Sequence, residues 1–215
     1  MVTNIKQVPI LLHTMDSYSW TWNHWYTLFK KYVSNHGPIY FLSEETAPDF
    51  VDDVIHIKSG NGEWGKRLLK GLEQIDSDLI FYMQEDFWAT NDLVLSDDIL
   101  DLFYQLNMET LHIKDVLFDY GKFTHIQSEL YRLQQYSQFT LNHQFGLWDV
   151  ETMKSLVLPN ETPWMNEING TNRRNTKEHN VYILNHKWYV SSVAKGKLLP
   201  RGKQVLIDNN LIENV

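Results

Sequence analysis

The chain has 215 residues, of which 43% are hydrophobic and 21% charged, and it contains no cysteine. This length suits one domain, which can bury enough surface to fold without disulfides or a structural metal. The absence of cysteine excludes a disulfide scaffold, a thiolate zinc site and a cysteine nucleophile, and it fits a reducing compartment. The 19 basic and 27 acidic residues give a net charge of -8. This charge argues against nucleic acid as the main partner, because such binding needs a clustered positive field.

The apolar stretches of the chain are all short. None approaches the roughly 20 residues that cross a bilayer, so we predict no membrane span. The first seven residues are polar and do not resemble a secretory signal. We therefore expect a cytoplasmic protein.

The first half of the chain alternates between two hydrophobic patterns. Short apolar runs bounded by polar residues predict strands, and apolar residues three and four apart predict helices. This alternation predicts an α/β fold whose central sheet is mostly parallel and flanked by helices. Strands are expected over residues 8–13, 39–42, 54–57 and 79–83, and helices over residues 22–32, 63–75 and 97–106.

The second half has a less regular pattern, which predicts mixed or antiparallel strands. Short strands are expected over residues 110–113, 122–126, 130–133, 138–141, 181–184 and 188–193. One helix is expected from residue 149 or 151 to about residue 157, and a second is expected to begin at Pro163. The tail from Arg201 reads as polar. We predict one domain, residues 1–215, in two halves: residues 1–107 and 108–215.

The most informative motif is Gln84-Glu85-Asp86, directly after the apolar run Leu79–Met83. Open α/β sheets bind their ligands at the carboxyl ends of strands. Successive strand side chains point to opposite faces, so Gln84 and Asp86 are expected to share one side of this strand. A carboxylate there can bind Mg²⁺ or Mn²⁺, which usually takes one or two protein carboxylates together with substrate phosphates. The alternative is a solvated acidic turn.

A second motif, Gly60-Asn61-Gly62, leads into the helix that carries Trp64 and Arg67. Free backbone N–H groups at a helix start can bind an anion. Arg67 lies one turn into this helix, so it can contact either a phosphate or an acid at the neighbouring strand end. An ordinary loop followed by a surface arginine explains the same residues equally well.

The order of these motifs resembles that of nucleotide-sugar glycosyltransferases with the GT-A fold. In particular, the Trp-x-x-Arg-Leu helix (residues 64–68) and the Gln-Glu-Asp-Phe strand end (residues 84–87) are similar to those of short transferases from large DNA viruses, phages and bacterial polysaccharide loci. The resemblance covers most of the chain and is strongest over residues 8–90. If the source is viral, the resemblance implies that the protein is located in the host cytoplasm.

The resemblance implies a role for each half of the chain. The first half would bind the nucleotide sugar and the second half the acceptor. Gln84 stands where the family has the first Asp of its Asp-x-Asp motif, which leaves Asp86 as the carboxylate for Mn²⁺ or Mg²⁺ and Glu85 as a helper or ribose contact. The residues implied in donor binding are Thr14, Asp16, Tyr18, Ser43, Trp64, Arg67, Gln84, Glu85 and Asp86.

The remaining implied residues lie nearer the C-terminus. His186 would be a further metal ligand, and Lys195 and Lys197 would neutralise the diphosphate. The acceptor pocket would include His143, Trp148 and Trp164, although His143 and Trp148 are equally typical of a protein interior.

Glu167 is the candidate general base. Pro163 suits the first turn of a helix, and Trp164 and Glu167, three residues apart, then lie on one face. A carboxylate beside an aromatic ring has a raised pKa and can accept a proton. Members of the resembled family that invert the anomeric centre use an acid on a helix in this region. Glu161 and Asp149 are the alternative bases.

The sequence thus predicts a metal-assisted, inverting glycosyltransferase that uses a nucleoside-diphosphate sugar, UDP-linked in the first instance, and a glycan or glycoprotein acceptor. A nucleotidyltransferase is the alternative enzyme, but residues 14–20 contain neither Gly nor Lys, which that class favours after its first strand. A carbohydrate-binding module would explain the eight tryptophans. Such modules are usually all-β, whereas this chain alternates.

Overall fold

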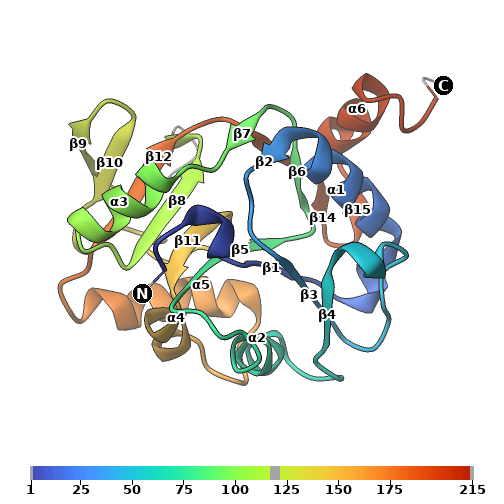
Figure 1. Cartoon of the computed structure of the whole chain (residues 1–215). Coiled ribbons are helices and arrows are strands. Elements are labelled where there is room, and N and C mark those ends of the chain that lie inside the picture. Colours follow the sequence, from blue (N-terminus) through green and yellow to red (C-terminus); the bar gives the residue numbers. More distant parts are fainter. Residues whose placement is uncertain (1, 117–121, 214–215) are drawn as a thin grey trace.

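The computed structural model describes residues 2–116 and 122–213. Within these ranges, no helix is both long enough and apolar enough to cross a membrane. The main sheet has nine strands, labelled in chain order in Figure 1. They are β1 (Ile10–His13), β3 (Ile39–Ser43), β4 (Ile55–Lys58), β5 (Leu79–Gln84), β8 (Thr110–Lys114), β9 (Phe123–Gln127), β10 (Leu130–Leu133), β11 (Gly146–Asp149) and β12 (Val181–Asn185).

The strand order across this sheet is β4-β3-β1-β5-β11-β8-β12-β10-β9. Strand β11 runs antiparallel to β5 and β8, and β10 runs antiparallel to β12 and β9. The other strands all run in one direction, so their carboxyl ends meet at one edge of the sheet. The predicted α/β fold, with a mostly parallel sheet and a mixed second half, is confirmed.

Helices cover both faces of the sheet. Helices α1, α3 and α6 pack on one face, whereas α2, α4 and α5 lie together on the other (Figure 1). Their bounds are α1 (Ser19–Tyr32), α2 (Trp64–Leu72), α3 (Asp97–Gln105), α4 (Val150–Leu156), α5 (Pro163–Asn175) and α6 (Pro200–Asp208).

Short elements complete the fold. Three short 3₁₀ helices precede strands or helices: η1 (Ile5–Gln7), η2 (Asp16–Tyr18) and η3 (Val51–Asp53). Three two-stranded ribbons lie outside the main sheet: β2 (Val33–Ser34) with β7 (Leu93–Val94), β6 (Phe87–Ala89) with β13 (Tyr189–Ser191), and β14 (Val193–Ala194) with β15 (Lys197–Leu198).

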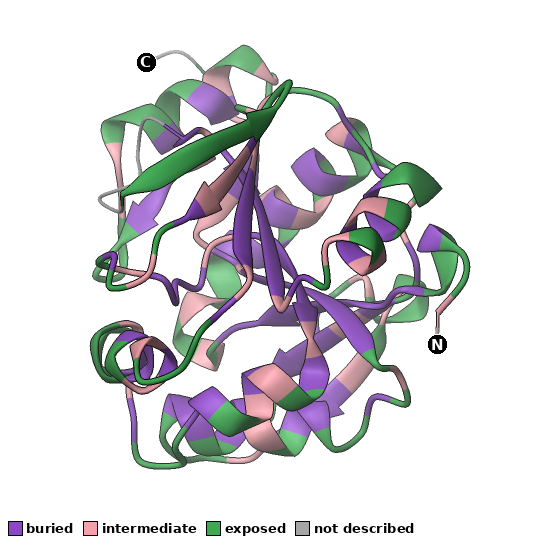
Figure 2. Ribbon diagram, turned by 90° about the vertical axis from the view of Figure 1, so that its left-hand side faces the viewer, coloured by how far each residue is buried: buried purple, intermediate pink, exposed green. Residues whose placement is uncertain are grey.

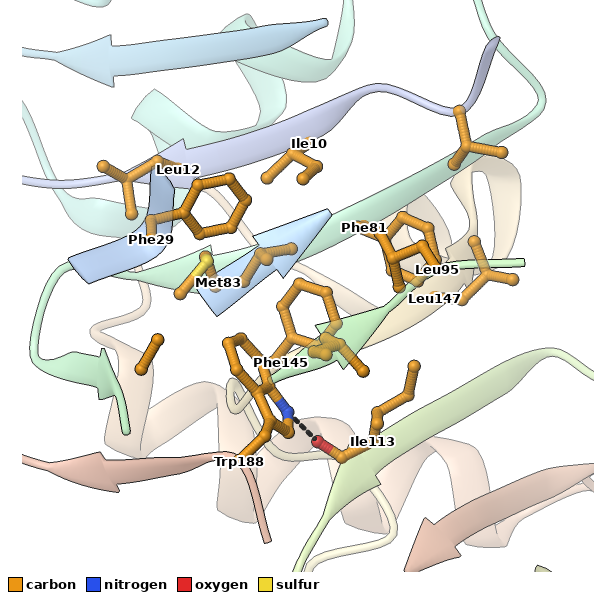
Figure 3. Packing of buried hydrophobic residues seen from close by; sticks show 14 of the residues in the cluster. Ile10, Leu12, Phe29, Phe81, Met83, Leu95, Ile113, Phe145, Leu147 and Trp188 are labelled. Atoms are coloured by element: carbon orange, nitrogen blue, oxygen red, sulfur yellow. Dashed lines mark hydrogen bonds between the residues drawn. The ribbon is translucent and has the colours of Figure 1, made fainter. Parts of the chain in front are cut away.

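Strand β5 shows why the central strands are continuously apolar. Phe81 and Met83 pack towards the face of α1, whereas Ile80 and Tyr82 pack towards α2 and α4. Both faces are covered, so every position needs an apolar side chain. Figure 3 shows the first of these two clusters, in which the indole of Trp188 donates a hydrogen bond of 2.9 Å to the carbonyl of Ile113. The edge strand β9, by contrast, is exposed along its length (Figure 2).

One expected strand was wrong, and two further segments are arranged in a way that the sequence pattern did not specify. Residues 138–141 form turns rather than a strand, with Phe139 at a φ of 53° and the backbone N–H of Leu141 bonded to the Thr171 hydroxyl instead of a neighbouring strand. Residues 188–193 divide between two ribbons, because they pair with β6 and β15 and not with the main sheet. The tail begins with helix α6, which Pro200 opens.

The expected strand also ends earlier than its acidic motif. Strand β5 stops at Gln84, and Glu85 and Asp86 form a turn into β6. Gln84 and Asp86 therefore do not share one side of a strand.

Candidate active site

The candidate site lies at the edge of the sheet where the parallel strands end. His13, the last residue of β1, is in register with Leu42 of β3 and Gln84 of β5. Because β11 is antiparallel, it begins at this edge and brings His143 and the residues around it to the same place. Open α/β sheets bind their ligands at such an edge.

Two acids follow β5 here: Glu85, which is buried, and Asp86, which is partly exposed. The turn that carries them is fixed by the indole of Trp88, which donates to the Glu85 carbonyl (2.9 Å), and by the backbone N–H of Ser192, which donates to the Asp86 carbonyl (2.7 Å). Burial raises the pKa of the Glu85 carboxyl, and the charge of Asp86 raises it further; burial also raises the pKa of Asp86. Oδ1 of Asp86 is buried without a hydrogen-bond partner among the described residues. A bound cation would satisfy that oxygen.

Glu167 faces this acidic turn from helix α5. Its Oε1 accepts a hydrogen bond of 2.9 Å from the backbone N–H of His143. Burial raises the pKa of Glu167, although this hydrogen bond and the positive charge of Lys114 oppose the rise. The charge of Glu167 in turn raises the pKa of Asp86, so the two carboxyls lie within electrostatic reach. The fold thus brings together the predicted base and the predicted metal carboxylate.

Arg201, near the start of α6, is a site residue that the sequence did not reveal. Its positive charge lowers the pKa of Asp86, against the effect of burial, and its Nε donates to the carbonyl of Ser191. The next residue, Gly202, packs so closely on Ser192 that a Cβ there would clash with the Ser192 carbonyl oxygen. The local sequence pattern does not indicate this role, because the tail from Arg201 is predicted only as a polar segment. Arg201 is exposed and therefore accessible to a ligand.

Three predicted donor contacts instead hold loops together. The carboxylate of Asp16 accepts backbone hydrogen bonds from residues 44–46, which lower its pKa although burial opposes this. The hydroxyl of Ser43 is fully buried and donates to the Thr46 carbonyl (2.6 Å). The hydroxyl of Thr14 accepts from the indole of Trp22 (2.9 Å) and is also buried. Ser43 and Thr14 therefore shape the site rather than line it, whereas Asp16 is partly accessible and its contact with a donor stays a prediction.

Arg67 and Trp64 are likewise buried, which corrects the expectation that they contact a donor. Arg67 is 2% exposed, and its Nη1 donates to the Thr14 carbonyl (2.7 Å). Its charge lowers the pKa of Glu85, so it supports the acidic turn electrostatically from below the surface. The Trp64 ring stacks on His13 at a centroid distance of 5.6 Å.

Gln84 and Tyr18 remain candidates for donor contacts, because both are partly accessible. The Gln84 amide donates to the Tyr82 hydroxyl (3.4 Å). The Tyr18 hydroxyl accepts a hydrogen bond from the backbone N–H of Gly196 (3.1 Å). Burial raises the pKa of Tyr18, and the charge of Glu85 raises it further. Tyr18 therefore lies between the acidic turn and the β14–β15 hairpin, which carries Lys195 and Lys197.

The predicted acceptor residues have three different environments. Trp148 is fully buried in β11, with Arg174 centred 5.0 Å from its ring, so its assignment to an acceptor pocket was wrong. His143 is also buried, and its backbone N–H donates a hydrogen bond to Glu167. Trp164 is 65% exposed, about one turn before Glu167 on the same helix. Only Trp164 is placed to contact an acceptor.

Neither alternative base is suited to accept a proton. Glu161 is buried, and hydrogen bonds from Arg173 and Asn166 lower its pKa to about 2, although burial opposes this. Asp149 caps α4 by accepting from the Thr152 N–H (2.7 Å), and it lies at the end of β11, away from the acidic turn. Glu167 is the remaining candidate.

The predicted metal ligands are only partly brought together. Nε2 of His186 lies 2.9 Å from the Asp92 carbonyl, so it is already engaged. Throughout the described residues, no group of three or more His, Asp or Glu side chains is arranged to hold a metal ion. The Glu85–Asp86 turn, with its unpartnered Oδ1, still fits a Mg²⁺ or Mn²⁺ ion that takes its other ligands from phosphates and water.

No protein-family model and no curated protein sequence matches this chain. Solved structures share its fold at low identity. S. aureus TarS 1-349 in complex with UDP-GlcNAc has a TM-score of 0.58 and 9% identity, covering 89% of this chain and 60% of that one. HddC from Yersinia pseudotuberculosis has a TM-score of 0.58 and 8% identity, covering 94% and 99%. UDP-glucose pyrophosphorylase in complex with UDP-glucose has a TM-score of 0.56 and 8% identity, covering 95% and 98%.

These similarities show that the chain has a GT-A-like fold, as its sequence predicted. The chain spans 37% of full-length TarS and about 60% of its 1-349 fragment. At identities this low the similarity establishes the fold alone. The resemblance to viral and phage transferases stays a prediction.

Proposed function

We propose that the protein is a glycosyltransferase that moves a sugar from a nucleoside-diphosphate sugar, UDP-linked in the first instance, to a hydroxyl of a glycan or glycoprotein. The observation that carries this proposal is that Glu167 on α5, which is bonded to the His143 N–H, lies within electrostatic reach of Asp86 in the turn after β5. Two proteins with a similar fold were solved with UDP-sugars, which supports this donor class.

In this mechanism Glu167 is the general base. Its only hydrogen bond among the described residues is to Oε1, so Oε2 is left for the acceptor. As Oε2 takes the acceptor proton, the acceptor oxygen bonds to the anomeric carbon from the face opposite the diphosphate. The carbon–oxygen bond to the diphosphate breaks, and its electron pair stays on the phosphate oxygen. The anomeric centre is inverted. A carboxyl with a raised pKa suits this role, because a base works best with a pKa near the ambient pH.

The leaving diphosphate needs positive charge beside it. Arg201 supplies a cation within electrostatic reach of Asp86 and is exposed to a ligand. Glu85 and Asp86 would hold Mn²⁺ or Mg²⁺, and such an ion, when bound, neutralises charge that develops on the phosphates. Trp164 would contact the acceptor beside Glu167.

A nucleotidyltransferase is the second candidate, because UDP-glucose pyrophosphorylase and HddC match this chain over nearly their whole lengths. The two reactions give different products. Glycosyl transfer releases UDP, whereas a pyrophosphorylase reaction forms UTP and a sugar phosphate when pyrophosphate is supplied. Mass spectrometry of a UDP-sugar panel, incubated with Mn²⁺ and either glycan acceptors or pyrophosphate, separates them.

We expect UDP and no UTP. Glu167→Gln should lower turnover by about 10²–10⁴-fold, because the amide cannot accept a proton, while donor binding stays near wild type. The control is Glu151→Gln, an exposed acid on α4 whose variant should keep full turnover. UTP formation that depends on pyrophosphate, or full turnover by Glu167→Gln, would overturn the proposal.

A further inference from the structure

A chain of buried polar contacts ends on Glu167. Glu161, Asn166 and His143 are at most 2% exposed, so none of them is accessible to a substrate. The contacts run from Arg173 Nη2 to Glu161 Oε2 (2.6 Å), from Asn166 Nδ2 to Glu161 Oε2 (2.6 Å), from Asn166 Oδ1 to His143 Nε2 (3.0 Å), and from the His143 backbone N to Glu167 Oε1 (2.9 Å).

These contacts determine which way each group points. Nδ2 of Asn166 faces the Leu156 carbonyl (2.8 Å) and the Glu161 carboxylate. Both of these groups are acceptors, since hydrogen bonds from Arg173 and Asn166 keep Glu161 ionised against the effect of burial. The oxygen of Asn166 therefore faces His143. Burial lowers the pKa of His143 to about 3, so its ring carries one proton. That proton must be on Nε2, where it is donated to Asn166.

Packing fixes the His143 ring as well. Trp64 lies against it with ring centroids 4.4 Å apart, and Tyr82 meets it edge to face at 5.6 Å. The ring is thus held by two aromatic neighbours and one hydrogen bond. Because the ring and the backbone N–H belong to one residue, holding the ring also aims the N–H at Oε1 of Glu167.

We infer that His143 and Asn166 are positioning residues for Glu167: they hold one oxygen of its carboxylate and so present the other to the acceptor. This inference rests on the proposed function for its chemical meaning. Neither residue touches the substrate. The effect passes through one backbone hydrogen bond, so it concerns the placement of the base and not the affinity for the donor.

The test compares two replacements of His143. His143→Phe keeps a ring against Trp64 and Tyr82 but removes the N–H that Asn166 accepts. His143→Gln places an amide nitrogen at about the reach of Nε2. We expect kcat to fall about 10²-fold in the phenylalanine variant, because a misplacement of about 1 Å costs that much, with the donor KM unchanged. The glutamine variant should return to within about threefold of wild type.

A double variant separates positioning from general damage. Residues that act through one group are not additive. In a Glu167→Gln background, His143→Phe should therefore cause no further loss of kcat. A second full loss in that background, or near-normal kcat in His143→Phe alone, would overturn the inference.

Amide hydrogen exchange tests the same hydrogen bond without activity. The amide of residue 143, followed by NMR, should exchange about 10-fold faster in His143→Phe and in Asn166→Ala than in wild type, because its partner is no longer aligned. In His143→Gln it should stay slow. Unchanged exchange in both disruptive variants would overturn the inference, whatever the activity. Faster exchange in a protein that transfers no sugar would instead overturn the proposed function and leave the positioning contact standing.

Discussion

The ion pair between Glu161 and Arg173 allows a quantitative prediction about stability. Its atoms lie 2.6 Å apart, and the side chains are 3% and 28% exposed respectively. Hydrogen bonds from Arg173 and Asn166 lower the pKa of Glu161 from 4.5 to about 2, although burial opposes this. At 1.36 kcal/mol per pKa unit, this shift corresponds to roughly 3 kcal/mol. Arg173 is partly exposed, so solvent screening reduces the value, and we expect about 2 kcal/mol.

The perturbation is Glu161→Gln, which keeps the shape and removes the charge. For a chain of this size, a loss of about 2 kcal/mol lowers the Tm by roughly 4–8 °C. The pH dependence has a definite sign. Since folding lowers the pKa of Glu161, its contribution is fully present above pH 4.5 and is lost as the pH falls towards 2. The difference in Tm between wild type and Glu161→Gln should therefore shrink between pH 5 and pH 3.

Differential scanning calorimetry across this pH range measures both effects. Glu151→Gln is the matched control, since its carboxylate also pairs with a basic residue but is 82% exposed. It should change the free energy of unfolding by at most about 0.5 kcal/mol. The reasoning is refuted if the two variants lose equal stability, or if the Glu161→Gln difference stays constant down to pH 3.

Two further predictions concern donor binding. In wild type, UDP should raise the Tm more with Mn²⁺ than with EDTA, as measured by thermal-shift assays. Asp86→Asn should abolish this difference, because an ion bound at the turn needs the carboxylate. An unchanged metal effect in the variant would contradict the prediction. Arg201→Gln should weaken UDP binding about 10-fold and UMP binding less, because a charge-assisted contact to phosphate contributes about 1.5–3 kcal/mol. Calorimetric titration measures both affinities, and Lys203→Gln, which removes another exposed cation of the same helix, is the control. Equal losses for both nucleotides would remove Arg201 from the diphosphate site.

The sequence by itself determined the central strands and the place of the site. The run Leu79–Met83 is apolar at every position, which is typical of a strand covered on both faces, and the acids directly after it predict a ligand-binding strand end. The helix containing Glu167 was likewise signalled by Pro163, which both the sequence and the structure place at its start. These features depend on residues that are neighbours in the chain, so the local sequence pattern was sufficient to predict them.

Only the tertiary structure decided which side chains meet. Trp148 and Trp164 belong to the same residue type and the same half of the chain, yet one is fully buried and the other is 65% exposed. Arg67 was expected to contact a donor phosphate or an acid at the strand end, yet it is buried and bonded to the Thr14 carbonyl. Arg201 lies within electrostatic reach of Asp86, and Gly202 beside it packs closely on Ser192. Such contacts join segments far apart in the sequence, and burial and charge depend on that three-dimensional packing, which no local pattern records.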